Sequence, residues 1–315
     1  MPKASDEEML LRAVGLARRG EGHTRPNPPV GAVLVKGGRI IGEGYHRRAG
    51  LDHAEVAAIK NALRRGKSAA NSTLYVSLEP CSRPGLVGAC TDAIVAAKIK
   101  RVVFAAVDPN PKNHGRAKRV LKSAGIKCEY RPLAAADQLI APFKKRVTTK
   151  LPYVTVKLAM SLDGKICDDY GNARWVSSSA ARKLTGKLRE RADAIMVGAE
   201  TIRQDNSSLL SHGKRNDDLI RAIVSRSGKL PPKAQVFTDN APNFTVVFSD
   251  AVAAVKTLGE CGCMHILCEG GLKLATSLAE AGLVDEWITV LAPKVIGTRH
   301  IRRATSVRST VICDD

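Results

Sequence analysis

The chain has 315 residues, the length of about two domains at the usual ~150 residues each. Hydrophobic residues make up 44% and charged residues 25%, as in ordinary globular proteins. No apolar run approaches the ~20 residues of a membrane span, which excludes a membrane-spanning helix. The acidic N-terminus runs directly into an amphipathic pattern, so we expect no signal peptide and a cytoplasmic protein.

The net charge is unusual, because 50 Lys and Arg stand against 30 Asp and Glu and give +20. Such a value is typical of proteins that bind nucleic acid. However, aromatic residues are only 4%, too few for the stacking surfaces of single-strand binders, and the basic residues are spread along the chain. Because a diffuse positive field also attracts phosphorylated small molecules, we expect a small phosphorylated ligand and no nucleic acid.

The first half of the chain alternates helical and β patterns. The expected helices are 7–19, 53–63, 91–98 and 116–124, and the expected strands are 30–35, 39–45, 73–78, 102–107 and 126–130. Gly37 and Gly38 separate the first two strands and predict a β-hairpin. The pattern favours a three-layer α/β domain with helices packed on a mixed sheet.

A basic connector is expected at 144–150, followed by a second α/β unit. Its expected strands are 153–159, 194–197, 222–225, 235–238, 245–248, 265–268 and 286–291, and its expected helices are 179–191, 250–258 and 272–281. The boundary lies near 147–151, so the expected domains are 1–147 and 148–315.

The eight cysteines are more typical of thiols or metal ligands than of disulfides in a cytosolic chain. Four of them are interpreted as small buried hydrophobic residues, namely Cys128, Cys167, Cys268 and Cys313.

The strongest chemical pattern is His53-Ala54-Glu55, followed by Glu79-Pro80-Cys81 and then by Cys90. His53, Cys81 and Cys90 form a nitrogen-and-sulfur set suited to one Zn²⁺, with the fourth position left for water. Zinc lowers the pKa of such a water to ~7, and Glu55 is placed to carry its proton to a leaving ammonia. The alternative is a helix-capping His53 beside incidental core cysteines.

Further motifs occur in order along the chain: 24–33 (TRPNPPVGAV), 42–46 (GEGYH), 53–55 (HAE), 79–82 (EPCS) and 108–111 (DPNP). With these motifs the chain resembles, over nearly its whole length, the bifunctional deaminase–reductase family of riboflavin biosynthesis. The eight-residue gap between Cys81 and Cys90 matches that family and differs from the two-residue gap of nucleic-acid deaminases.

The resemblance implies a cytidine-deaminase-like three-layer domain followed by a dihydrofolate-reductase-like domain. It implies zinc-dependent hydrolytic deamination of 2,5-diamino-6-ribosylamino-4(3H)-pyrimidinone 5′-phosphate. It also implies NADPH-dependent reduction of the ribosyl group to a ribityl side chain. A homo-oligomer is expected for such folds.

The resemblance also implies residue roles. In the deaminase half, Asn27 and His46 line the substrate pocket, although a turn-forming asparagine and a structural imidazole are the alternatives. In the reductase half, the implied substrate residues are Lys157, Arg189, Leu209 and Glu269. The implied NADPH residues are Ala159, Trp175, Thr201, Asp205, Gly270 and Gly271.

Some positions depart from the family pattern. The loop 81–90 carries Arg83 in place of a histidine and lacks Thr-Pro-Pro, and 112–114 is Lys-Asn-His in place of a small apolar stretch. His212 stands where an arginine is expected to grip the substrate phosphate, and Arg226 is a candidate to replace the lost charge. The chain stops at Asp315, where relatives continue through a final strand, so we expect the reductase domain to lack that strand.

Two alternatives therefore stay open. One is a deaminase whose reductase domain is degenerate and serves assembly. The other is a basic RNA-binding or RNA-editing deaminase, which the charge of +20 favours and the cysteine spacing disfavours.

Overall fold

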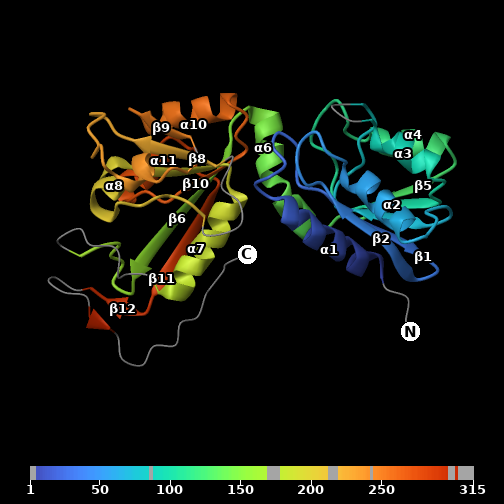
Figure 1. Ribbon diagram of the computed structural model, residues 1–315, viewed down its shortest axis with the longest axis horizontal. Coiled ribbons are helices and arrows are strands. Elements are labelled where there is room, and N and C mark those ends of the chain that lie inside the picture. Colours follow the sequence, from blue (N-terminus) through green and yellow to red (C-terminus); the bar gives the residue numbers. More distant parts are fainter. Residues whose placement is uncertain are drawn as a thin grey trace. The chain divides into compact units, whose positions relative to one another are not determined.

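The computed structural model describes residues 5–84, 88–168, 178–211, 219–241, 244–296 and 302–303. The chain divides into two compact units, Met1–Lys150 and Leu151–Asp315 (Figure 1).

The first unit is built on a five-stranded sheet with the order β2-β1-β3-β4-β5. Its strands are β1 (Gly31–Lys36), β2 (Arg39–Tyr45), β3 (Thr73–Val76), β4 (Arg101–Phe104) and β5 (Lys127–Tyr130). β1 runs antiparallel to β2 and β3, whereas β3, β4 and β5 are parallel, which confirms the predicted mixed sheet. Gly37 and Gly38, with φ of 57° and 75°, form the hairpin turn that the sequence predicts.

Helices cover both faces of this sheet. They are α1 (Asp6–Ala17), α2 (Ala54–Arg64), α3 (Cys90–Ala96), α4 (Arg116–Ser123), α5 (Ala134–Leu139) and α6 (Ala141–Thr149), with a short 3₁₀ turn at Arg18–Gly20. Successive strand residues point to opposite faces, so Leu34 packs in a cluster with α2, while Val33 packs in a cluster with α1. The result is the predicted three-layer arrangement.

The segment 144–150, expected as a connector, differs from that expectation. Residues 144–149 belong to α6, whose first turn contains a proline, and Lys150 follows the helix as its C-cap in the left-handed region with φ of 67°. Neither α5 nor α6 was predicted from the pattern.

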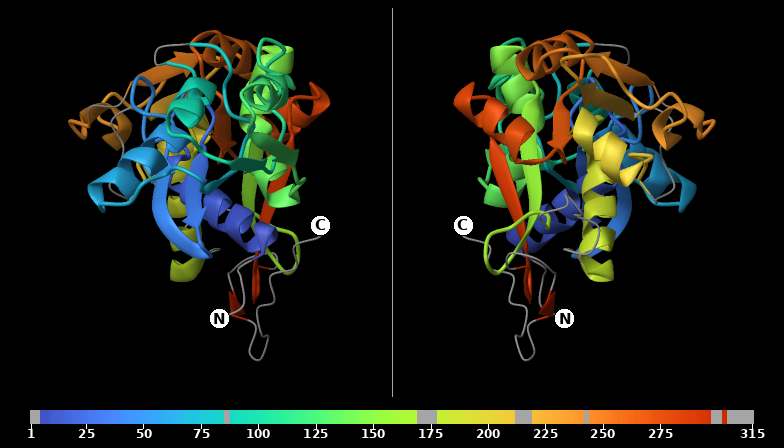
Figure 2. Two further views of the ribbon diagram at one scale, coloured as in Figure 1. Left: turned by 90° about the vertical axis from the view of Figure 1, so that its right-hand side faces the viewer. Right: turned by 90° about the vertical axis from the view of Figure 1, so that its left-hand side faces the viewer.

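The second unit has a six-stranded, fully parallel sheet with the order β11-β6-β10-β7-β8-β9. Its strands are β6 (Tyr153–Ser161), β7 (Ala194–Gly198), β8 (Ile220–Val224), β9 (Thr245–Phe248), β10 (His265–Cys268) and β11 (Glu286–Ala292). β6 lies beside β11, as the green and red strands of Figure 2 show, although paired residues such as Thr155 and Glu286 are 131 positions apart in the sequence. A short ladder joins β12 (Lys294–Val295) to β13 (Arg302–Arg303).

Both faces of the second sheet are also covered. Its helices are α7 (Ser179–Arg191), α8 (Ala199–Asp205), α9 (Gln235–Thr238), α10 (Ala251–Glu260) and α11 (Leu272–Glu280). One apolar cluster joins α10 and α11 to one face, and another joins α8 and α9 to the other. The prediction of a strand at 235–238 is wrong, because that segment is α9.

The buried cysteines largely follow the prediction. Cys128 and Cys268 are buried, Cys167 is partly exposed, and Cys313 lies outside the described residues. The C-terminal residues 304–315, where a final strand was expected to be missing, also lie outside them.

Candidate active sites

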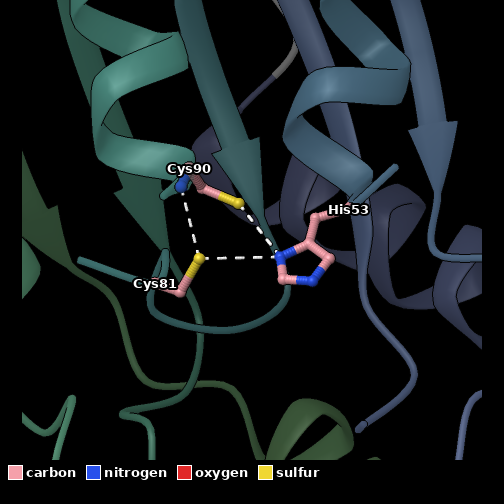
Figure 3. Close-up of side chains that lie close together, drawn as sticks. All are labelled: His53, Cys81 and Cys90. Carbon is pink, nitrogen blue, oxygen red and sulfur yellow. Dashed lines mark hydrogen bonds between the residues drawn. The ribbon is translucent and has the colours of Figure 1, made fainter. Parts of the chain in front are cut away.

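Three side chains of the first unit converge at the ends of three elements (Figure 3). His53 precedes the first residue of α2, Cys81 lies in the loop after β3, and Cys90 opens α3. Nδ1 of His53 is 3.2 Å from Sγ of Cys90 and 3.5 Å from Sγ of Cys81. All three donor atoms lie within 4.8 Å of one another, so one ion can reach them together.

The chemistry of this donor set fits zinc. One imidazole nitrogen and two sulfurs leave the fourth tetrahedral position open, as in catalytic zinc sites. Hydrogen bonds from the Cys90 thiol and the His53 imidazole lower the pKa of the Cys81 thiol to about 4. The fold thus brings the three predicted ligands into one cluster, although His53 and Cys90 are 37 positions apart in the sequence.

Glu55 lies beside this cluster on the first turn of α2 and is only 3% exposed. Burial raises the pKa of its carboxyl to about 7. Glu55 lines the same cavity as His53 and Cys81. A buried carboxyl next to a metal-ligand set is the arrangement expected of a group that exchanges protons.

The cavity has a volume of about 410 Å³ and lies within the first unit. Its described lining includes Asn27, His46, Arg83 and Lys112, with apolar contributions from Pro28, Val30, Leu78 and Phe143. A small heterocycle fits a space of this size and mixed polarity.

Asn27 and His46 are joined in the wall of this cavity. Nδ1 of His46 is 3.1 Å from the carbonyl oxygen of Asp52, so that nitrogen must donate. Burial lowers the pKa of His46, and its Nε2 therefore accepts from the Asn27 amide at 3.1 Å. Both residues, predicted to line the pocket, are found there, and this bond fixes the orientation of the asparagine.

Glu79 is a functional residue that the sequence argument did not assign. Its carboxylate accepts hydrogen bonds from the main-chain N–H groups of Asp108 at 3.3 Å, Gly115 at 3.0 Å and Ala117 at 3.0 Å. The N-cap residue of α4 makes no side-chain cap, and Glu79 supplies one instead. Glu79 thereby ties this helix to the start of the cysteine loop, residues 81–90. The sequence signal for this capping role is weak: an acidic residue stands between an expected strand and an expected metal ligand.

In the second unit, Lys157, Arg189 and Glu269, which the resemblance assigns to substrate binding, come together. Nε and Nη2 of Arg189 donate to the two carboxylate oxygens of Glu269 at 2.6 and 3.0 Å, and Nη1 donates to the carbonyl of Leu210 at 2.9 Å. Lys157 of β6 is near both, and burial lowers its pKa while Glu269 opposes that shift. The three side chains form a polar cluster near the carboxyl ends of the parallel strands, where ligands bind in such sheets.

Leu209 is placed differently from what a substrate contact suggests. Its side chain is 1% exposed and packs in the apolar cluster with Ile202 and Ile223. Its φ of 58° is unusual for a residue other than glycine. Its main-chain N–H donates to Oγ of Ser207 at 3.4 Å, so a substrate contact at Leu209 is left to its carbonyl group.

The predicted cofactor residues are spread over three elements. Ala159 is on β6, Thr201 and Asp205 are on α8, and Gly270-Gly271 joins β10 to α11. A Cβ on Gly271 would meet nothing within 4 Å, and α11 has no side-chain cap, so its N-terminal N–H groups fit a phosphate. Trp175 and His212 lie outside the described residues, and Arg226 is an exposed residue after β8.

No helix among the described residues is long and apolar enough to cross a membrane.

Comparisons with known proteins cover both halves of the chain. The family model "Cytidine and deoxycytidylate deaminase zinc-binding region" matches residues 3–106, and "RibD C-terminal domain" matches residues 152–310. Riboflavin biosynthesis protein RibD of Aquifex aeolicus is 35% identical over 94% of this chain and 89% of its own length. That of Bacillus amyloliquefaciens is 38% identical over 93% of this chain and 85% of its own length.

Two solved structures are similar over nearly the whole chain. A diaminohydroxyphosphoribosylaminopyrimidine deaminase/5-amino-6-(5-phosphoribosylamino)uracil reductase from Thermotoga maritima is 32% identical with a TM-score of 0.85, covering 98% of this chain and 93% of that one. RibD of Acinetobacter baumannii is 31% identical with a TM-score of 0.81, covering 98% of this chain and 92% of that one.

Proposed function

The chain belongs to the RibD family of riboflavin biosynthesis proteins, and from that premise we propose which of its residues carry each of its two reactions. It is a zinc-dependent deaminase and an NADPH-dependent reductase, with a cytidine-deaminase-like domain followed by a dihydrofolate-reductase-like domain. We assign deamination to residues 1–147 and reduction to residues 148–315. The observation that carries the deaminase assignment is the buried Glu55 beside the His53, Cys81 and Cys90 donor set.

In the deaminase half, His53, Cys81 and Cys90 hold one zinc ion. The chemistry that bound zinc supplies is activation of water at neutral pH. Glu55 accepts a proton from the attacking water and returns it to the amino group that leaves as ammonia. His46 holds the Asn27 amide group, whose oxygen is then available to the polar edge of the pyrimidine ring.

The substrate of this half carries a phosphate. We assign its binding to Arg83 and Lys112, the lysine and arginine side chains found among the described lining residues of the cavity. Both are exposed at that cavity and can meet the phosphate without burying a charge. Replacing both by glutamine should raise KM for deamination with little change in kcat, and an unchanged KM would refute this assignment.

In the reductase half, NADPH supplies the hydride when bound, so the residues of this chain bind and orient the cofactor and the substrate. The N-terminus of α11 at Gly270-Gly271 receives a cofactor phosphate, and Ala159, Thr201, Asp205 and Trp175 complete the proposed cofactor site. Glu269 accepts hydrogen bonds from ribose hydroxyl groups while Arg189 holds it in place. Lys157, the main chain at Leu209 and Arg226 contribute the remaining substrate contacts.

A coupled assay on the diaminopyrimidinone phosphate tests both assignments. Without NADPH the deaminated product should accumulate, and with NADPH the cofactor should be consumed in step with it. Deamination without NADPH consumption would leave a deaminase with a degenerate reductase domain.

The ligand is a small phosphorylated pyrimidine and not a nucleic acid, and the protein is cytoplasmic. The cavity of about 410 Å³ supports the first statement, since a space of this size suits a single heterocycle. Salt-dependent retention of tRNA by the purified protein would contradict it. Fractionation of cells that produce the protein tests the second, which recovery with the membranes would contradict.

We also propose a homo-oligomer. Trp287 and Leu291 of the edge strand β11 are 49% and 51% exposed, which supports contact with another copy. A monomeric mass by light scattering would contradict that proposal.

A further inference from the structure

Asn113 has an unusual set of contacts for a loop residue. It lies between β4 and α4 and is 6% exposed. Its Oδ1 accepts hydrogen bonds from the main-chain N–H of Ser82 at 2.7 Å and from the Ser82 hydroxyl at 2.9 Å. Its Nδ2 donates to Oδ2 of Asp108 at 2.9 Å and to the carbonyl of Pro80 at 3.4 Å.

These four bonds use the full capacity of a carboxamide, which has two donor hydrogens and two acceptor lone pairs. The partners also determine which way the amide faces. An exchange of oxygen and nitrogen would set the amide N–H groups against the Ser82 main-chain N–H. It would also set the carbonyl oxygen against the Asp108 carboxylate, so only one orientation is stable.

Ser82 and Pro80 are the two neighbours of Cys81. We propose that Asn113 is a positioning residue for the metal ligand Cys81, which it holds by fastening the residue on either side of it. The inference rests on the proposed zinc site. Asn113 itself touches neither His53 nor the cysteines through any of the bonds described here, so its effect on the metal passes through the backbone of residues 80–82.

The loop that carries Asn113 is itself firmly held. The main-chain N–H of Asn113 donates to the carbonyl of Asn110 at 2.8 Å, and Oδ1 of Asp108 accepts from the main-chain N–H of Asn110 at 2.8 Å. Nδ1 of His114 donates to the carbonyl of Asp108 at 3.0 Å. Three further main-chain N–H groups of the segment 108–117 donate to the Glu79 carboxylate, so this segment is a fixed support for the loop that begins at Cys81.

The cysteine loop needs such an anchor because of its sequence. Between Cys81 and Cys90 it contains two glycines, Gly85 and Gly88, and it lacks the Thr-Pro-Pro of the family pattern. A loop with more glycine and less proline loses more conformational entropy when it is ordered. The contact between Ser82 and Asn113 ties the start of this loop to 112–114, a segment that also departs from the family pattern.

Asn113→Leu tests the proposal, because the leucine side chain branches at Cγ as asparagine does but makes none of the four bonds. Zinc affinity, measured by competition with a chromophoric chelator, should fall by ~10-fold or more, as when partners that orient metal ligands are removed. After replacement of zinc by Co²⁺, the thiolate-to-cobalt absorption should weaken or shift. This readout reports the geometry of the sulfur ligand and does not depend on turnover.

Asn61→Leu is the matched control. Asn61 accepts a hydrogen bond from the main-chain N–H of Glu43 at 3.1 Å in the same unit, but it flanks no metal ligand. It should lower thermal stability while zinc affinity and the cobalt spectrum stay as in the unmodified protein. An equal loss of zinc affinity in both variants would mean that general destabilisation causes it, which overturns the proposal.

Ser82→Ala removes one of the four bonds and keeps Asn113 in place. It should weaken zinc binding less than Asn113→Leu, and the double variant should be less impaired than the sum of the two changes. If Asn113→Leu does not fold, the Ser82→Ala cobalt spectrum decides alone, and an unchanged spectrum overturns the proposal. If the unmodified protein binds no zinc, the metal site itself is refuted. If the unmodified protein binds zinc normally and Asn113→Leu changes neither zinc affinity nor the cobalt spectrum, only this inference is refuted.

Discussion

Arg189 grips Glu269 with two parallel hydrogen bonds, from Nε to Oε1 at 2.6 Å and from Nη2 to Oε2 at 3.0 Å. Their side chains are 14% and 10% exposed, so the pair is shielded from most solvent. Because the third N–H group of Arg189 holds the carbonyl of Leu210, one planar guanidinium fixes both the acidic residue and the loop after α8. The proposed ribose contact is therefore set in place before substrate arrives.

Arg189→Lys keeps the positive charge but cannot form the two-pronged contact. We expect KM of the reduction step to rise by ~10-fold or more, as for loss of a charge-assisted hydrogen bond worth ~1.5–3 kcal/mol. Steady-state NADPH consumption on the deaminated substrate measures it. Deamination by the same preparation should be unchanged and serves as the control, while an unchanged KM would show that Glu269 does not need Arg189.

Glu55→Gln keeps the size of the side chain but removes its capacity to accept a proton. Deamination should slow by ~10²-fold or more, as when a general acid–base group is lost. Zinc content, measured in the same sample by metal analysis, should stay near one ion per chain. Near-normal turnover with full zinc would exclude Glu55 from the proton transfer.

Cys81→Ser replaces a sulfur donor by a hydroxyl, which is a poor ligand for zinc at neutral pH. We expect purified protein to contain little zinc and to lose deamination. Reduction of separately prepared deaminated substrate should persist, since the reductase residues belong to the second unit. Full zinc retention would mean that the ligand set is wrong.

Arg101 links Asp6 and Glu129 on the first unit, with contacts of 2.6 and 2.7 Å. It holds the pKa of both carboxyls at about 2, below their ordinary values of 3.8 and 4.5. The folded pKa values are lowered, so the unfolded chain takes up protons first as the pH falls. The stabilisation is present above the ordinary values and is lost as the pH falls through them toward 2.

Arg101→Gln should therefore reduce thermal stability at pH 7, and the difference from the unmodified protein should shrink below the ordinary carboxyl pKa values. Unfolding followed by circular dichroism over this pH range measures the difference. High salt should also shrink it, because the three side chains are partly exposed. A difference that is the same at every pH would mean that Arg101 acts through packing alone.

Sequence periodicity predicted most of the fold because the strands of the first unit alternate cleanly between two apolar faces, as Val33 and Leu34 do. It failed at 235–238, where Val236 and Phe237 suggest a strand. The main-chain N–H of Gln235 donates to Oδ1 of Asn206 at 2.7 Å, so the helix is capped by a residue 29 positions away. The sequence pattern of residues 235–238 alone cannot indicate a bond to a residue so far away.

The candidate deaminase site was also predicted only in part. The metal ligands and Glu55 could be predicted because their chemistry places them in short motifs, at 53–55 and 79–82, and at a fixed spacing from Cys81 to Cys90. Glu79 and Asn113 could not, since each acts through main-chain groups 29 to 38 positions away. Their residue types are compatible with many surface loops, and only the folded chain shows what they hold.

The strand order of the second sheet has a consequence for how the protein folds as it is synthesised. The first unit completes its sheet with β5, which ends at Tyr130, so it can fold while the rest of the chain is still being made. β6 instead lies between β10 and β11 and has no strand partner until residues 265–292 emerge from the ribosome. The apolar strand Tyr153–Ser161 is thus left uncovered for about a third of translation, a period in which the growing chain is most exposed to aggregation and to capture by chaperones.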